Sequence, residues 1–266
     1  MIEALSYDFM QNALIAGILV SLISGVIGSL IVVNRMVFLA GGIAHAAYGG
    51  IGIAIYSGFS IFLGTTVFAV IAALFMAFVT INQREKIDTF IGLIWAVGMA
   101  IGIIFVDLTP GYNVDLMSYL FGSILAVNDD DLYFMGLLFI VVLFIVTFWY
   151  RDILAVSYDS EYAALRGINV KLFYTLILIL SALTVVIAIK VVGLILVIAL
   201  LTIPIYIAQS LSSSLYMMMI SSGFIATFFT IVGLWISYSY NLTSGACIIL
   251  VAALSLMIFM IGVKIK

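Results

Sequence analysis

The sequence predicts an all-α integral membrane protein, a polytopic bundle of about eight to nine transmembrane helices. Of its 266 residues, 67% are hydrophobic and only 8% are charged, and the mean hydropathy is +1.42. A soluble domain carries about a quarter charged residues, so a soluble fold could not bury this much apolar surface. The apolar residues also fall into stretches of about 20, the length at which a helix crosses a bilayer.

The apolar stretches predict about nine spans separated by short polar breaks. They cover residues 10–33, 37–56, 61–81, 89–106, 132–150, 172–189, 191–209, 215–238 and 244–263. A further stretch, 116–127, is too short to cross and is expected to form a re-entrant or interfacial helix on the outer side. The first span follows acidic rather than basic residues, which favours a retained span over a signal peptide. We expect one membrane domain over 1–266, with any energy-coupling domain on another chain.

The distribution of cationic residues predicts the orientation of the spans. If the loop with Arg151, Arg166 and Lys171 is cytoplasmic, alternation through the spans places nearly every other Lys and Arg there too. Those residues are Arg35, Arg84, Lys86, Lys264 and Lys266. Only Lys190 is left outside, where the acidic residues gather, so the N-terminus is expected outside and the C-terminus inside. An error of one span would reverse the first half.

Small residues are frequent at close spacing in the first two spans. They are Gly17, Ser21, Ser24, Gly25, Gly28 and Ser29 in the first, and Gly41, Gly42, Ala46, Gly49 and Gly50 in the second. Small residues let helix backbones approach closely where lipid supplies no hydrophobic driving force. The pattern therefore predicts a compact bundle.

The long cytoplasmic loop has the pattern of a short, well-capped helix at about 158–167. Ser157 or Asp159 could serve as the N-cap, and Glu161 suits the first turn. Arg166 suits the last turn, and Gly167 suits the position that ends a helix. A surface helix of this kind could dock into the groove of a partner, although the segment could also be a simple connection.

Polar residues inside the spans are few, and His45 is the only histidine of the chain. It falls about 12 Å into the second span, where an ionisable residue is costly unless it faces an interior or an aqueous cavity. Neutral imidazole is also the commonest metal ligand among side chains. Two interpretations stay open, a buried histidine bonded to a neighbouring helix and a ligand on a transport pathway.

The two prolines mark further features. Pro204 removes a backbone hydrogen bond inside the seventh apolar stretch and predicts a helix break, which often accompanies a transport pathway. Pro110 and Gly111 suit a type II turn on the outer face. Asp107 and Asp115 flank that turn and either attract cations or serve as ordinary loop charges.

The ordered motifs resemble the permease subunits of the zinc, manganese and iron family of ATP-binding-cassette importers, relatives of the vitamin B12 and siderophore permeases. The resemblance rests on residues 12–17, 34–39, 108–125, 192–204 and 243–246. It implies the type II, vitamin B12 permease-like architecture and a multi-pass protein in the cell membrane of a prokaryote.

The resemblance also implies the function and the partners. The chain would be the permease of an importer for a divalent metal ion, zinc, manganese or iron, and would work as a homodimer in the lipid bilayer, without nucleic acid. Two cytoplasmic ATPase subunits and an extracytoplasmic solute-binding protein would complete the importer. ATP would act only through the partner subunit, and no cofactor would be bound permanently. The expected coupling helix would contact the ATPase through Tyr158, Asp159, Glu161, Arg166 and Gly167. No phosphate-binding loop of the G-x-x-x-x-G-K-[ST] type occurs in the sequence, which agrees with a chain that is not an enzyme.

The second span departs from the family at Gly41 and within residues 47–50, where the family's usual proline after the histidine is absent. Family members commonly carry an aspartate one helical turn before the histidine, whereas Gly41 precedes His45 here. A carboxylate from Asp107 or Asp115, a pair of His45 residues across the dimer, or a substrate that is not a bare ion would each account for this. A permease for a metal chelate or siderophore is therefore the alternative function.

Two other classes of function fit the sequence poorly. An intramembrane hydrolase needs clustered ionisable or nucleophilic residues, and one histidine without a carboxylate clearly inside a span does not provide them. A passive channel would have no evident use for the capped cytoplasmic helix.

Overall fold

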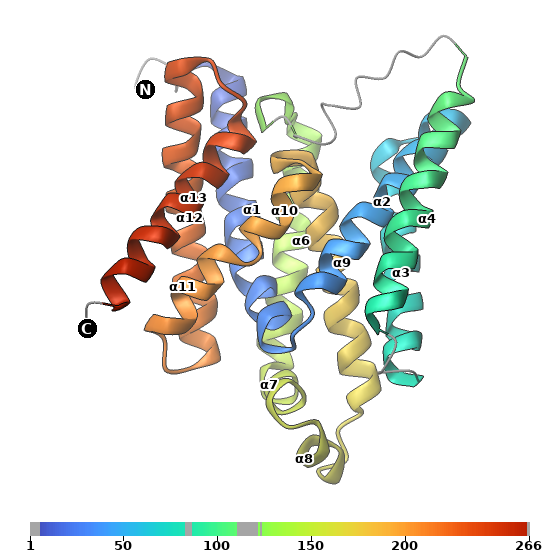
Figure 1. The fold of residues 1–266 in the computed structure, drawn as a ribbon, viewed down its shortest axis with the longest axis vertical. Coiled ribbons are helices and arrows are strands. Elements are labelled where there is room, and N and C mark those ends of the chain that lie inside the picture. Colours follow the sequence, from blue (N-terminus) through green and yellow to red (C-terminus); the bar gives the residue numbers. More distant parts are fainter. Residues whose placement is uncertain (1–5, 83–86, 111–121, 123, 265–266) are drawn as a thin grey trace. The chain divides into compact units, whose positions relative to one another are not determined.

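The computed structural model describes residues 6–82, 87–110, 122 and 124–264, and this part of the chain is helical without any β-strand (Figure 1). Its contacts divide it into two compact units, each discontinuous in sequence. Unit 1 comprises Met1–Val32, Met117–Phe148 and Ile187–Lys266, and unit 2 comprises Val33–Leu116 and Trp149–Val186.

Eight of the described helices are long and apolar enough to cross a membrane, which confirms the predicted fold class. They are α1 (Asp8–Val33), α2 (Val37–Ser57), α3 (Ile61–Asn82), α4 (Ile87–Asp107), α6 (Asp129–Phe148), α9 (Val170–Val192), α12 (Leu215–Tyr240) and α13 (Ser244–Lys264). Shorter helices connect them, namely η3 (Ile124–Ala126), α7 (Tyr150–Tyr158), α8 (Ser160–Leu165), α10 (Leu194–Leu200) and α11 (Ile203–Leu211).

The stretch 191–209, expected as one continuous span, is interrupted twice. Gly193 separates α9 from α10 with φ 82° and ψ 166°, a conformation that side-chain-bearing residues rarely adopt. The second break follows Leu200, and α11 restarts with Pro204 in its first turn, where a missing N–H is tolerated. The hydroxyl of Thr202 donates to the carbonyl of Ile198 at 2.7 Å and so partners one of the freed backbone oxygens. The predicted break at Pro204 is present. Of the short stretch expected at 116–127, residues 116–121 and 123 lie outside the described residues.

In unit 1, α1 packs antiparallel to α12 through the small residues of the first span. A side chain at Gly17 would come within 2.6 Å of Thr230, and one at Gly28 within 2.8 Å of Ile205 on α11. The hydroxyls of Ser21 and Thr230 bond at 2.8 Å. The predicted close packing of the first span is confirmed.

In unit 2, α2 lies against α3 and α4 (Figure 1). The contacts run in the same order along α2 and α4, which makes these two helices parallel. A side chain at Gly42 would come within 2.9 Å of Ile91, and one at Gly98 within 2.5 Å of Ala46. The backbones of α2 and α4 can approach this closely only because these positions are small.

Two polar bonds bear on the predicted orientation. In unit 1 the Asn12 amide donates to Asp129 at 2.8 Å, which places the start of α1 beside the start of α6. In unit 2 the Asn34 amide donates to the Ser157 hydroxyl at 2.9 Å, which places the loop after α1 beside the end of α7. Both bonds join segments that the alternation of spans assigned to the same side of the membrane.

Candidate functional site

His45 lies in the middle of α2, and its imidazole stacks on the indole of Trp95 from α4. The ring centroids are 3.9 Å apart and the ring planes differ by 9°. The close α2–α4 packing at Gly42 and Gly98 sets the backbone separation on either side of the pair. Both rings are half-buried, whereas the α2 residues next to His45 are buried. The stack therefore lies at an edge of the α2–α4 contact rather than at its centre.

The two nitrogens of His45 differ in their surroundings. Nδ1 is buried and has no hydrogen-bond partner among the described residues. The bond to a neighbouring helix that one interpretation expected is thus not made at this atom. Leaving a buried polar atom unpaired costs about 1–3 kcal/mol. Because Nδ1 is buried, Nε2 is the nitrogen left to bind a ligand.

Of the two predicted aspartates, the structure describes only Asp107, which does not lie near His45 within the same chain. Asp107 is exposed at the C-terminal end of α4, about 18 Å along the helix axis from Trp95. Because Trp95 marks the level of His45, the Asp107 carboxylate is too far away to share a ligand with the imidazole. Asp115 lies outside the described residues. Within the described residues, no three His, Cys, Asp or Glu side chains are grouped to hold a metal ion.

Helix α8 is closed at both ends as the sequence pattern predicted. The Asp159 carboxylate accepts from the backbone N–H of Tyr162 at 2.9 Å and caps the N-terminus. At the other end, the N–H of Gly167 donates to Ala164 at 3.0 Å and the N–H of Ile168 donates to Ala163 at 3.0 Å. This pair of bonds is a Schellman motif, which requires a left-handed residue after the helix, and Gly167 supplies it with φ 79°.

The outer surface of α8 and the end of α7 expose large side chains. Tyr158 is 63% exposed, Tyr162 51% and Leu165 88%. The guanidinium of Arg166 lies 5.7 Å from the centre of the Tyr162 ring, within range of a cation–π interaction. Ala163 is fully buried and anchors the other face of the helix. A six-residue helix that buries a single alanine and exposes apolar and charged groups has the surface of a docking element.

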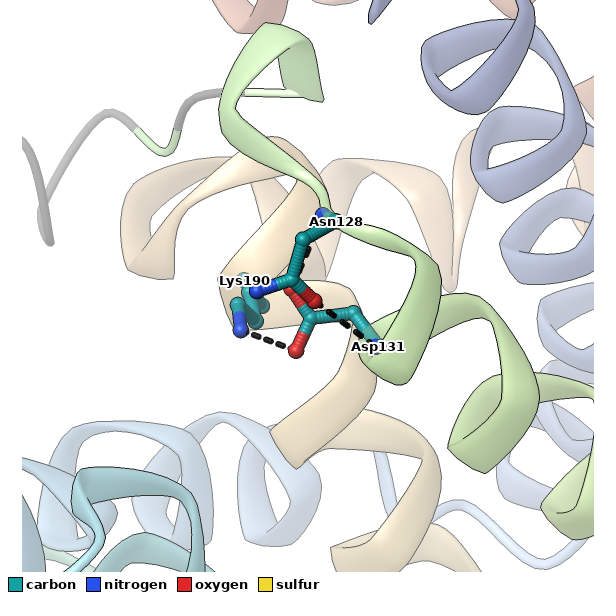
Figure 2. A network of polar contacts seen from close by, with 3 residues as sticks. All are labelled: Asn128, Asp131 and Lys190. Carbon is teal, nitrogen blue, oxygen red and sulfur yellow. Dashed lines mark hydrogen bonds and ion pairs between the residues drawn. The ribbon is translucent and has the colours of Figure 1, made fainter.

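A polar network in unit 1 ties the start of α6 to the end of α9 (Figure 2). The Asp131 N–H donates to the Asn128 side chain at 2.9 Å, and the Asn128 N–H donates back to the Asp131 carboxylate at 3.2 Å. Lys190, in the last turn of α9, forms an ion pair with the same carboxylate. Lys190 is the one cation that the predicted orientation places on the outer side, and the ion pair supplies it with a counter-charge.

Three of these features are not predicted by the sequence. Trp95 lies in a predicted apolar span, and its partner, His45, is 50 positions earlier in the chain. The pairing of Lys190 with Asp131 was missed for the same reason. The predicted span began at residue 132, but Asp129, Asp130 and Asp131 form the first turn of α6, where negative charge is favoured.

Comparison with known proteins identifies the family. A family model described as the ABC 3 transport family matches residues 6–263. The membrane protein slr2045 of Synechocystis is 49% identical over 97% of this chain and 92% of its own length. The manganese transport system membrane protein MntC of Listeria monocytogenes is 36% identical over 94% of this chain and 89% of its own length. The solved structure of PsaBC from Streptococcus pneumoniae in complex with Fab superimposes with a TM-score of 0.88 at 32% identity, covering 97% of this chain and 93% of that one.

Proposed function

This chain belongs to the ABC 3 transport family, and from that premise we propose that it carries a divalent metal ion across the membrane past His45. It is the permease subunit of a bacterial ATP-binding-cassette importer and a multi-pass membrane protein, and it does not itself hydrolyse ATP. Manganese is the first ion to test, because the Listeria relative is named for manganese transport.

The position and partial exposure of His45 carry the proposal. An imidazole in the middle of a span that is half-buried in the isolated chain cannot face lipid without a cost of several kcal/mol. It must instead face water or a second protein surface. Imidazole nitrogen is an acceptable ligand for manganese, ferrous iron and zinc.

A second copy of the chain would supply the missing ligands. Each chain offers one histidine in all, and no group of three or more His, Cys, Asp or Glu side chains among the described residues could hold a metal ion. Two His45 rings meeting across a homodimer would give two nitrogen ligands, and water would fill the other positions. Weak ligation of this kind suits an ion that must leave the site again.

Helix α8 would transmit movement from a separate ATPase subunit. Its exposed Tyr158, Tyr162 and Leu165 would enter a groove on the ATPase, while the caps at Asp159 and Gly167 would keep the helix rigid. Glu161 and Arg166 would provide the charged contacts at the edge of that groove.

Uptake tests the proposal. Proteoliposomes would contain this chain with its ATPase and solute-binding protein, and uptake of manganese, zinc, ferrous iron and a ferric chelate would be compared. We expect selective divalent-ion uptake that His45→Ala reduces more than tenfold, the loss of one ligand being worth at least 1.4 kcal/mol. Chelate uptake that is indifferent to His45→Ala would contradict the proposal and support the alternative of a chelate permease.

The coupling helix is tested with a matched pair of glycines. Gly167→Ala and Gly58→Ala both replace a left-handed glycine that ends a helix and has open space around it. Each should cost about 1 kcal/mol of unfolding free energy. Only Gly167→Ala, and the charge reversal Glu161→Lys, should lower transport per ATP hydrolysed. If transport per ATP hydrolysed is equal in Gly167→Ala, Glu161→Lys and Gly58→Ala, α8 is not the coupling helix.

A further inference from the structure

The stack of His45 on Trp95 sets the orientation in which the only histidine can meet an ion. The ring planes lie within 9° of parallel and the ring centroids are 3.9 Å apart. Rotation of the imidazole about its Cβ–Cγ bond would therefore drive it into the indole. With Nδ1 buried, the ring is held with Nε2 as its available nitrogen. Orientation of a metal-binding histidine is commonly fixed by a hydrogen bond from its other nitrogen, and no such bond is present at Nδ1 among the described residues.

The charge of a bound ion must also be offset near the His45 ring. When Nε2 binds a divalent cation, the imidazole becomes electron-poor, and a nearby group must offset this charge in the membrane interior. Helix α2 contains no Asp or Glu, and the described part of α4 carries only Asp88 and Asp107. Both lie near the helix ends, about 10 Å and 18 Å along the axis from Trp95. The electron-rich face of the indole is the group in contact with the ring, and tryptophan is the best aromatic partner for a cation.

We propose that Trp95 is the positioning residue for His45: its indole fixes the imidazole plane so that Nε2 faces the ion, and its face offsets the positive charge that the ring acquires on binding. This inference rests on the proposed passage of a divalent ion past His45. It adds a specificity element, because a flat aromatic face can stabilise an imidazole bound to a bare cation but offers no ligand to a bulky anionic chelate.

The packing around the pair supports a dedicated arrangement. At Gly42, Gly49 and Gly98, α2 and α4 are so close that an added side chain would come within 3.0 Å of an atom of the other helix. This approach lets the two rings overlap face to face. Trp95 is itself half-buried, with the exposed Gly92 and Ala96 on its own helix, so the contact with His45 is not a by-product of filling a closed core.

Transport by Trp95 variants tests the proposal. Initial rates of manganese uptake would be measured in the complete importer for Trp95→Phe, Trp95→Leu and the matched control Trp235→Leu, a half-exposed tryptophan on α12. We expect Trp95→Leu to lower the rate about tenfold, Trp95→Phe to retain it within about threefold, and Trp235→Leu to match the wild type. Equal rates for the Phe and Leu variants, whether reduced or normal, would overturn the positioning role.

A spectroscopic signature separates this role from simple packing. The chain has three tryptophans, so Trp149→Phe combined with Trp235→Phe leaves Trp95 as the single emitter. Zn²⁺ titrated into the purified full chain should change the emission of Trp95, and His45→Ala should abolish that change. Emission that does not respond to Zn²⁺ while His45 is intact would overturn the proposal. Normal uptake by His45→Ala would refute the proposed function itself, whereas failure of the Trp95 variants alone leaves that function standing.

Discussion

The polar network at Asp131 and the polar ring at His45 represent two ways in which this chain handles ionisable groups. At the start of α6, Asp131 has a capping partner and a counter-ion, and each bond joins residues of unit 1. In unit 2, His45 has a ring stacked on it and a buried nitrogen without a partner. Satisfied groups stabilise a fold, whereas an orphaned one must be maintained for another reason. We therefore expect a structural role for Asp131 and, in line with the proposed function, a functional role for His45.

The largest expected effect comes from removing the orphaned ring. His45→Leu keeps a side chain of similar bulk in α2 but supplies no nitrogen ligand. Uptake should fall more than tenfold, while the thermal midpoint of the purified chain should stay unchanged or rise, since an unpaired buried nitrogen is removed. A variant that loses stability in parallel with uptake would place His45 with the structural groups. Thermal unfolding in detergent, measured beside uptake, distinguishes these outcomes.

Removing the satisfied carboxylate should give the opposite pattern. Asp131→Ala loses the capping bond to the Asn128 N–H and leaves Lys190 without its counter-charge. We expect the unfolding free energy to fall by about 2 kcal/mol, the sum of a cap and a partly shielded ion pair. Uptake per folded molecule should remain near that of the wild type. If uptake instead falls at unchanged stability, the Asp131 network belongs to the pathway.

Asn128→Ala isolates the cap from the ion pair. The Asn128 side chain accepts from the Asp131 N–H at 2.9 Å and is exposed, so its loss leaves the Lys190 contact in place. The unfolding free energy should fall by about 1 kcal/mol, as for other caps. Asn128→Asp retains an acceptor at the cap, so it should keep most of the unfolding free energy that Asn128→Ala loses. Equal losses for both variants would show that the cap bond itself contributes little.

The sequence was sufficient for the fold class because apolar stretches of about 20 residues have one stable solution in a bilayer. It also predicted the caps of α8, since Asp159 and Gly167 act on backbone groups a few residues away. The split of 191–209 was only half anticipated. Pro204 predicted one break. The break at Gly193 depends on its surroundings, since a side chain at Gly122 would clash with the backbone of Gly193.

Contacts between residues far apart in the chain could not be predicted from the sequence. Gly41 indicated that a carboxylate was missing near His45, yet neither Trp95 nor its ring geometry could be read from residues 50 positions apart. Asp107 does not lie near His45 within one chain, and the reason is simple. Helix α4 carries it about 18 Å past the level of the histidine, and hydropathy does not reveal how two helices are paired in register.

Substitution of Lys190 should give the smallest effect. At this residue the positive-inside rule and the ion pair with Asp131 predict opposite results. As the one cation assigned to the outer side, it opposes the positive-inside bias, so Lys190→Met should leave insertion unchanged or improve it. The ion pair predicts that Lys190→Met destabilises the folded protein, because Asp131 is only 13% exposed and loses its counter-charge. Lys190 is 40% exposed, so solvent screening limits the loss to about 0.5–1 kcal/mol. Lys190→Arg, which keeps the charge, should lose less than Lys190→Met in thermal unfolding at low salt, and the gap should narrow at high salt. A gap that persists at high salt would mean that packing of the side chain, rather than its charge, holds the end of α9 against α6.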